Sequence, residues 1–211
     1  IPEAMCKVSG ERYVIGCINI SEYDAIGIGP GIGLQKETAI SLNEIFRSNN
    51  KRFVLDADAL NQLSADKKLL ASIPPGSVIT PHQKEFERMF GSASNDFERL
   101  QNAINHASRL NIYIVLKGHY TAIITPLGKV YFNSTGNPGM AKAGMGDVLT
   151  GIITGLITQQ YPLPEAAMIA VYLHGMAGDI AGTNYSQQAM QASDLIKCMA
   201  DAWNSISLLK Q

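Results

Sequence analysis

A glycine-rich segment, Gly136–Gly151, carries the strongest chemical signal in the chain. It reads Gly-Asn-Pro-Gly-Met-Ala-Lys-Ala-Gly-Met-Gly-Asp-Val-Leu-Thr-Gly, and the sequence that follows is apolar and favours a helix. The glycines at 144 and 146 can turn backbone N–H groups toward a ligand, and the start of a helix adds partial positive charge. The segment therefore predicts a cradle for phosphate oxygens.

One carboxylate, Asp147, sits at the junction between this loop and the expected helix. A carboxylate beside a phosphate site repels the ligand, so binding alone does not explain its presence. It is useful if it takes a proton from a hydroxyl that is about to receive a phosphoryl group. The alternative is that Asp147 only caps the helix, a position that aspartate favours. The surrounding glycines favour the catalytic interpretation.

Two more carboxylates, Asp56 and Asp58, follow the apolar run Phe53–Leu55. Alternate residues of a strand share a face, so both side chains would point the same way if the strand continued. Paired acids at the end of a strand can hold Mg²⁺ through water. The alternative is that Asp58 caps the next helix and that only Asp56 faces a site.

Two polar segments also follow apolar runs and would lie at the ends of strands. In Thr80–Glu85, His82 can donate to a substrate, and Glu85 falls on the same side of a starting helix. The alternative is a structural histidine in a helix cap. In Lys117–Thr121, a lysine and a glycine after a parallel strand suit a nucleotide phosphate or ribose, whereas the alternative is a solvated turn.

A further glycine-rich turn, Gly27–Gly33, resembles a dinucleotide-binding fingerprint but fails its spacing. The third glycine of that motif would fall on Ile32 or Leu34. The turn can still let a ligand approach the backbone closely, and the alternative is a tight connection between a strand and a helix. A Walker A motif is also missing, because the lysines at 36, 117 and 142 do not follow glycine in the required frame.

The elements that must position these residues alternate between short apolar runs and amphipathic stretches. Strands are predicted at 23–29, 52–57, 77–80, 112–116, 121–125 and 129–132, and helices at 34–47, 96–110, 147–159, 164–181 and 193–209. Ser94 marks the expected N-cap region of the helix at 96–110, and His174 is interpreted as a packing or capping residue. Strands that are apolar throughout indicate an α/β fold with a mainly parallel sheet, in which ligands bind beyond the carboxyl ends of the strands.

The composition is that of one globular domain with a full core: 211 residues, of which 46% are hydrophobic and 17% charged. The net charge of −1 and the scattered basic residues argue against nucleic acid or an anionic membrane as the main partner. No apolar run reaches the roughly 18 residues that span a bilayer. Three unevenly spaced cysteines, Cys6, Cys17 and Cys198, predict reduced thiols and a cytoplasmic protein.

Six motifs occur in one order over nearly the whole chain. They are Gly-Ile-Gly-Pro-Gly-Ile-Gly at 27–33, Val-Leu-Asp-Ala-Asp-Ala-Leu-Asn at 54–61, Thr-Pro-His at 80–82, Val-Leu-Lys-Gly at 115–118, Asn-Pro-Gly-Met-Ala at 137–141 and Gly-Met-Gly-Asp-Val-Leu-Thr-Gly at 144–151. With these motifs the chain resembles the ADP/ATP-dependent NAD(P)H-hydrate dehydratases, a nicotinamide-nucleotide repair family of the ribokinase-like superfamily. The resemblance implies an α/β, ribokinase-like (Rossmann-like) three-layer sandwich with a mainly parallel central sheet.

The resemblance also implies a role for each candidate site residue. Asp147 would be the catalytic base, and the contacts to the hydrated nicotinamide nucleotide would be Gly31, Gly33, His82 and Asp147. The contacts to the adenine nucleotide would be Lys117, Gly118, His119, Tyr120, Thr121 and Gly146. The anion hole would be built from Ala143, Gly144, Met145 and Gly146. Candidate support for a metal or phosphate comes from Asp56, Asp58, Asn61, Glu85 and Asn137, with no certain metal ligand.

The implied reaction restores NADH or NADPH from the S epimer of its hydrate, NADHX or NADPHX. ADP or ATP phosphorylates the ring hydroxyl, Mg²⁺ neutralises the nucleotide phosphates, and phosphate then leaves as the double bond returns. Such an enzyme is a lyase. Bacterial relatives generally favour ADP, which is therefore the expected donor. Relatives commonly form homotetramers, and an NAD(P)H-hydrate epimerase is an expected fused or separate partner.

The chain departs from the family pattern in two respects. The family usually has an N-terminal segment with its own glycine-rich turn, and no match to it occurs here. The expectation is thus a single dehydratase domain over residues 1–211 that lacks this segment. Gln83-Lys84 also replaces the Pro-Gly that many relatives have after Thr-Pro-His. Two alternative functions are a vitamin-precursor or sugar kinase of the same superfamily and a non-catalytic nucleotide-binding module.

Overall fold

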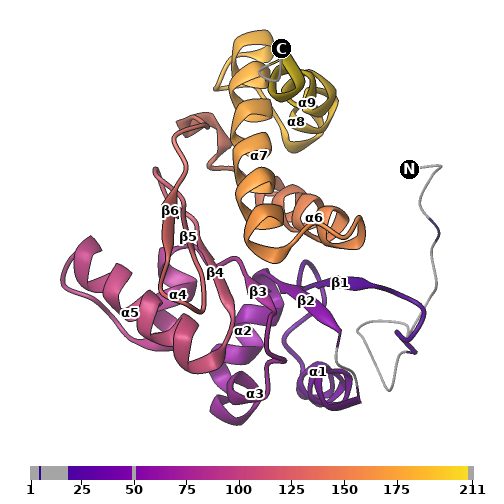
Figure 1. Cartoon of the computed structure of the whole chain (residues 1–211), viewed down its shortest axis with the longest axis vertical. Helices are drawn as coiled ribbons and strands as arrows, with labels where there is room; N and C mark the ends of the chain where they lie inside the picture. Colours follow the sequence, from indigo (N-terminus) through magenta and orange to yellow (C-terminus); the bar gives the residue numbers. More distant parts are fainter. Residues whose placement is uncertain (1–4, 6–18, 49–50, 209–211) are drawn as a thin grey trace.

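The computed structural model describes residue 5, residues 19–48 and residues 51–208. Within these residues, six strands form one sheet in the order β1-β2-β3-β4-β5-β6 (Figure 1). They are β1 (Ala25–Ile28), β2 (Arg52–Leu55), β3 (Val78–Ile79), β4 (Tyr113–Leu116), β5 (Ala122–Ile124) and β6 (Val130–Phe132). The first four strands run parallel, and β5 and β6 form an antiparallel hairpin at the edge. The predicted α/β fold with a mainly parallel sheet is confirmed.

In the part of the chain that the structure describes, five helices cover one face of this sheet. They are α1 (Lys36–Ser48), α2 (Ala57–Ala65), α3 (Lys67–Ala71), α4 (Gln83–Phe90) and α5 (Asp96–Leu110). Phe53 and Leu55 of β2 point into this layer, where they join buried side chains such as Leu42, Leu60 and Phe86. Because consecutive strand residues face opposite sides, this strand also supplies the other layer.

The opposite face is covered by α6 (Met145–Thr158) and α7 (Leu163–Tyr185). Val54 packs there with Ile153 and Val171, so the sheet is buried on both faces and the fold has three layers (Figure 1). Two short helices, α8 (Ala192–Lys197) and α9 (Met199–Leu208), pack against α7 in a third apolar cluster. A short 3-10 helix, η1 (Pro138–Met140), lies in the loop before α6.

Several predicted boundaries are wrong, each for a local reason. The strand predicted at 52–57 ends at Leu55, because Ala57 adopts a positive φ and begins α2. The helix predicted at 193–209 is divided at Cys198, whose N–H turns back to the carbonyls of Asp194 and Leu195. Residue 209 lies outside the described residues. The helix expected after Asp58 in the capping alternative is α2, but its N-cap is Asp56, and Asp58 is its second residue. The short helix α3 was not predicted, and α6 begins two residues earlier than expected.

The N-cap region predicted near Ser94 is correct, although the cap itself is Asn95. Its side chain accepts the N–H of Glu98 at 2.9 Å, while Ser94 donates to the Glu98 carboxylate from its N–H and its hydroxyl. In the described part of the chain, no helix is long and apolar enough to cross a membrane.

Cys198 is a free buried thiol, and burial raises its pKa. Cys6 and Cys17 lie outside the described residues.

The sheet delivers the candidate site residues to one edge. Backbone bonds continue the strand ladder past the strand ends, from Asp56 N–H to the Ile28 carbonyl at 3.1 Å and from Lys117 N–H to the Pro81 carbonyl at 2.8 Å. His82 and Lys117 also form an isolated parallel bridge. The turn after β1 and the polar residues after β2, β3 and β4 therefore meet where α6 begins, as expected for a parallel sheet.

Candidate active site

The phosphate cradle predicted from the glycines is the start of α6. Gly144 is the N-cap, with a φ of 84°, and no side chain caps the helix. Only glycine adopts this conformation at little cost, which explains the residue type at 144. The Met145 N–H turns back to the Lys142 carbonyl at 3.4 Å. The N–H groups of Gly146 and Asp147 have no partner inside the helix and carry partial positive charge, so they are available to an anion.

Two cavities flank this helix start. The first, of about 680 Å³, is lined by Ala143, Met145 and Gly146 of the cradle and by Lys117. The second, of about 950 Å³, is lined by Asp147 and by residues of the turn after β1. Gly146 and Asp147 are consecutive, yet they line different cavities. The start of α6 therefore lies between two spaces of ligand size.

The capping alternative for Asp147 finds no support in the helix itself. Gly144 occupies the cap, and Asp147 is the third residue of α6. Its side chain is exposed and lines the second cavity. A carboxylate in the first turn still gains from the helix dipole, but that gain is small and does not require this position. Asp147 is therefore free to meet a ligand.

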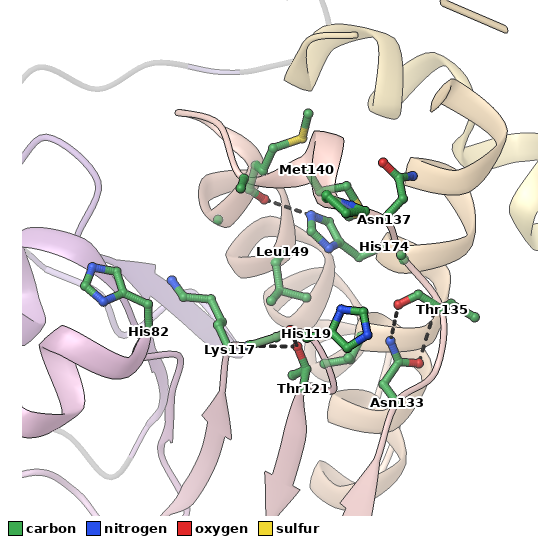
Figure 2. A pocket seen from close by; sticks show the side chains of 18 of the residues that line it. His82, Lys117, His119, Thr121, Asn133, Thr135, Asn137, Met140, Leu149 and His174 are labelled. Carbon is green, nitrogen blue, oxygen red and sulfur yellow. Dashed lines mark hydrogen bonds between the residues drawn. The ribbon is translucent and has the colours of Figure 1, made fainter. Parts of the chain in front are cut away.

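A lysine faces the cradle from the end of β4. The Lys117 Nζ lies 2.9 Å from Asp56 Oδ1 and 3.9 Å from Glu85 Oε2. A Cβ added to Gly146 would lie 3.3 Å from this Nζ. In Figure 2 the Lys117 side chain extends toward His82. The ammonium group therefore sits directly against the start of α6.

His82 combines the two roles that the sequence left open. It caps α4: its Nδ1 accepts the Glu85 N–H at 3.2 Å, while Glu85 Oε2 accepts the His82 N–H at 2.8 Å. The imidazole remains 48% exposed and lines the first cavity. Because Nδ1 is occupied by the cap, Nε2 is the atom left to contact a ligand.

Asp56 and Asp58 do not share a face, so that prediction is wrong. The strand ends before them, and each carboxylate has its own partners. Asp58 Oδ2 accepts the Gly33 N–H at 3.0 Å, and Gln62 donates to the Gly33 carbonyl at 3.3 Å. Asp58 thus holds the glycine turn. Gly31 in that turn has open space around its Cα, and a Cβ there would meet nothing within 4 Å.

The segment after β4 lies on the first cavity, with one exception. Gly118, His119 and Thr121 line it, and the Thr121 hydroxyl donates to the Gly118 carbonyl at 3.3 Å (Figure 2). Tyr120 does not line this cavity; its side chain is 62% exposed and its ring packs edge-on against His119. Of the five residues predicted in the segment 117–121, the four other than Tyr120 therefore line the first cavity.

The family is decided by a comparison over nearly the whole chain. Residues 1–201 match the family model described as NAD(P)H-hydrate dehydratase. The chain belongs to the NAD(P)H-hydrate dehydratase family. It is 42% identical over 179 residues to the bifunctional NAD(P)H-hydrate repair enzyme Nnr of Moorella thermoacetica, a match that covers 84% of this chain and 34% of that protein. The chain thus spans about a third of the length of the bifunctional relatives it matches.

Single-function relatives match over a larger share of their length. The ADP-dependent (S)-NAD(P)H-hydrate dehydratase of Bacillus subtilis is 34% identical over 206 residues, which cover 96% of this chain and 72% of the relative. The structure of the B. subtilis ADP/ATP-dependent enzyme, co-crystallised with ATP/Mg²⁺, matches with a TM-score of 0.76 and 32% identity, and covers 88% of this chain and 66% of that one. These matches also confirm the ribokinase-like fold.

In this dehydratase-family chain, the loop before α6 is held by α7. Gly136 donates its N–H to Asp179 Oδ2 at 2.9 Å. Asn137 donates its amide N–H groups to Asp179 Oδ1 at 3.0 Å and to the Gly178 carbonyl at 2.9 Å, and accepts the Gly139 N–H at 3.0 Å. The side chain of Asn137 is therefore used to shape the loop.

Lys142 fastens the same loop to the segment that follows α7. Its Nζ donates to the carbonyls of Gln187, Gln188 and Met190 at 3.0, 2.7 and 2.9 Å. No role for this lysine was predicted from the sequence, because it does not stand in the frame of a Walker A motif. A flanking glycine, Gly139, leaves no room for a side chain, since a Cβ would lie 2.6 Å from the Gln187 carbonyl. Both residues therefore lie against the segment that joins α7 to α8.

His174 of α7 supports the first helical turn directly. Its Nε2 lies 2.8 Å from the Met145 carbonyl, and the ring borders the first cavity (Figure 2). Burial lowers the pKa of His174 from 6.5 to about 4, against an opposing effect of the bond to Met145. The ring is therefore neutral at pH 7 and donates from Nε2. The sequence signal was a single imidazole in an otherwise apolar helix, which we interpreted as packing or capping.

We expect this histidine to make folding sensitive to mild acid. Because its pKa is lower in the folded state, the unfolded chain binds a proton first as the pH falls below 6.5. The contribution of His174 to the free energy of unfolding is fully present above pH 6.5. It is lost as the pH falls to about 4, and the total loss is about 3 kcal/mol. Urea unfolding at pH 7.5 and 4.5 measures this loss, and His174→Gln, which keeps an N–H donor, should show a smaller one. An equal loss in both proteins would assign it to other groups.

Proposed function

We propose that the protein dehydrates the S epimer of NADHX or NADPHX to NADH or NADPH, using ADP or ATP as phosphoryl donor. The observation that carries the proposal is the helix start of α6, where Gly146 lines one cavity and Asp147 the other. The nucleotide would occupy the first cavity, with Lys117 at its phosphates. The hydrated nicotinamide would approach Asp147 from the second. The enzyme would be a lyase, and ADP is the donor we favour.

The reaction follows from the residues on each side of the helix start. The Asp147 carboxylate takes the proton of the ring hydroxyl, whose oxygen attacks the terminal phosphorus of the nucleotide. The bond from that phosphorus to its bridging oxygen breaks, so AMP leaves when ADP is the donor and ADP leaves when ATP is the donor. Backbone N–H groups at 143–146 stabilise the negative charge on the transferred phosphoryl group. Phosphate then leaves with the electrons of the C–O bond, and loss of a proton from the neighbouring carbon restores the double bond. Phosphorylation thus replaces hydroxide by a better leaving group.

A magnesium ion in this site would be carried mainly by the nucleotide. Among the described residues, no group of three or more His, Cys, Asp or Glu side chains could hold a metal. Asp56, Asp58 and Asn137 already have partners. Mg²⁺ is commonly bound by substrate phosphates and waters with few protein ligands, which suits this site. When bound, it would neutralise phosphate charge. Asn61 and Glu85 remain proposed supports for the metal or the phosphate. The Asn61 Oδ1 is buried without a hydrogen-bond partner among the described residues.

The substrate contacts Gly31, Gly33 and His82 remain proposals with different support. His82 is exposed to the first cavity, where it could reach a substrate that extends past the helix start. Gly33 uses its N–H and its carbonyl within the protein, so it would contact a ligand through its Cα. Gly31 has open space around it. Neither of these two glycines lines the second cavity, which this turn borders through Gly29, Pro30 and Ile32. The nicotinamide ring would therefore have to extend beyond that cavity to touch Gly31 or Gly33.

The domain organisation is part of the proposal. Residues 1–211 would form one dehydratase domain, and the family's additional N-terminal segment would lie beside β1. Within the described residues, β1 has no partner strand on its outer side, and its side chains border the open second cavity. We further propose a cytoplasmic homotetramer and an NAD(P)H-hydrate epimerase, fused or separate, as partner; bifunctional relatives support the epimerase.

A single assay tests the activity. The full-length protein, Mg²⁺ and hydrated NADH are mixed with ADP or with ATP, and the return of NADH absorbance and the release of phosphate are followed. We expect recovery that requires a nucleotide and is faster with ADP. A stable phosphorylated alcohol in place of NADH would support the alternative kinase. Nucleotide binding without turnover of any substrate would support a non-catalytic binding module.

A further inference from the structure

Asp56 is the buried centre of the polar groups around the cradle. Its side chain is 2% exposed. Oδ1 accepts the Lys117 ammonium at 2.9 Å, and Oδ2 accepts the Thr150 hydroxyl at 3.1 Å. These partners come from β4 and α6, while Asp56 itself follows β2. One carboxylate therefore joins three separate elements at the point where the two cavities approach each other.

The Asp56 carboxylate lies close to Gly146 at the start of α6. A Cβ added to Gly146 would lie 3.2 Å from Asp56 Oδ2 and 3.3 Å from Lys117 Nζ. The ion pair thus packs against the second residue of α6. Thr150 lies one turn after Asp147 on the same helix, so its bond to Asp56 also fixes the helix that carries the base.

We propose that Asp56 is a positioning residue, which holds the Lys117 ammonium at the start of α6 and thereby directs it at the transferred phosphoryl group. This inference rests on the proposed function, and it gives Asp56 a part that differs from magnesium support. Both of its oxygens already have partners, so a metal would have to displace the lysine or the threonine. Lys117 is only 23% exposed and cannot swing freely into solvent without leaving a buried carboxylate unpaired.

The physical benefit is preorganisation. A lysine side chain has four rotatable bonds and would otherwise lose conformational freedom when phosphate binds. Here the ion pair fixes the ammonium before any ligand arrives, so no rearrangement is needed as charge develops on the phosphoryl group. Glu85, whose Oε2 lies 3.9 Å from Nζ, places a second negative charge beside the ammonium. The lysine keeps N–H donors for a ligand because it has three.

A double-mutant cycle separates positioning from general support of the fold. The variants are Asp56→Asn, Lys117→Met and their combination, in the full-length protein. Asn keeps the shape and can still bond to both neighbours, but it removes the charge that holds the ammonium. If Asp56 acts through Lys117, Asp56→Asn should lower kcat by about 30-fold in the wild-type background and by less than about 3-fold beside Lys117→Met, as expected for directly coupled residues.

ADP binding provides a second measurement, which does not depend on the proposed reaction. ADP binding is measured by calorimetry on the same four proteins, because the ammonium should also meet ground-state phosphates. We expect Asp56→Asn to weaken ADP binding only when Lys117 is present. Thermal unfolding of each protein reports whether loss of the buried charge damages the fold. Should Asp56→Asn fail to fold, Thr150→Val, which frees Oδ2 without changing the charge, replaces it in the cycle.

The outcomes are distinct. An inactive wild-type protein that binds ADP would contradict the proposed dehydratase activity, and the binding cycle would still test the positioning role. An active wild-type protein in which Asp56→Asn costs the same factor with and without Lys117 would overturn the inference and leave the function intact. The inference would also be overturned if Asp56→Asn weakened ADP binding by the same factor with and without Lys117. Coupled losses in both cycles would support it.

Discussion

Asp147→Asn should lower turnover by at least about 100-fold while leaving nucleotide binding nearly unchanged. The amide keeps the size and the helical position of the side chain but cannot take a proton from the substrate hydroxyl. A positioned general base contributes about 10²- to 10⁴-fold to rate, so the loss should fall in that range or beyond. The nucleotide would bind in the first cavity, whereas Asp147 lines the second, which explains why ADP affinity should persist. Turnover of hydrated NADH and calorimetric ADP binding measure the two effects.

Glu165→Gln is the matched control for this variant. Glu165 is an exposed carboxylate at the third position of α7, as Asp147 is of α6, so both substitutions remove one charge from a first helical turn. The loss of dipole stabilisation should be at most about 1 kcal/mol in either case. Only Asp147→Asn should lower turnover by at least about 100-fold. Wild-type turnover in Asp147→Asn would exclude the residue as the base and return Asp147 to a capping or electrostatic role.

The sequence predicted the sheet and the helix start after Gly144 because both depend on local patterns. Runs such as Ile112–Leu116 are apolar at every position, which indicates a strand buried on both faces, and β4 is such a strand. Glycines at 144 and 146 before an apolar helical stretch indicated a helix start that binds anions, and α6 begins there. Strand order and parallel pairing then place the strand ends together without further information.

The connections inside the site could not be predicted, because they join residues far apart in sequence. The Thr150 hydroxyl bonds to Asp56, 94 positions away, and nothing near either residue indicates it. The divergence of Asp56 and Asp58 depends on one backbone conformation, the positive φ of Ala57, at a residue type that rarely adopts it. The hydrogen bond of His174 could not be predicted for a similar reason, because its partner is a backbone carbonyl on another helix.

Gly146→Ala should leave the fold intact and still lower turnover by about 100-fold, the cost of a disturbed oxyanion site. Gly146 is not among the glycines with positive φ, so the helix itself accepts alanine at this position. The new methyl group would lie 3.2 Å from Asp56 Oδ2 and 3.3 Å from Lys117 Nζ, closer than side chains normally approach. It would push the ammonium away from the cradle and occupy space that a phosphoryl oxygen needs. Thermal unfolding and turnover of hydrated NADH measure the two effects separately.

Gly155→Ala on the same helix controls for the change in helix propensity. A Cβ at 155 would meet nothing within 4 Å, so this variant should unfold at the same temperature or higher, since alanine favours a helix by about 1 kcal/mol over glycine. Its ADP affinity should match the wild type, because Gly155 does not line the first cavity. Weaker ADP binding in Gly146→Ala alone would show that the glycine is required for space at the phosphates. Equal ADP affinity and turnover in Gly146→Ala and the wild type would instead mean that the phosphoryl group passes elsewhere.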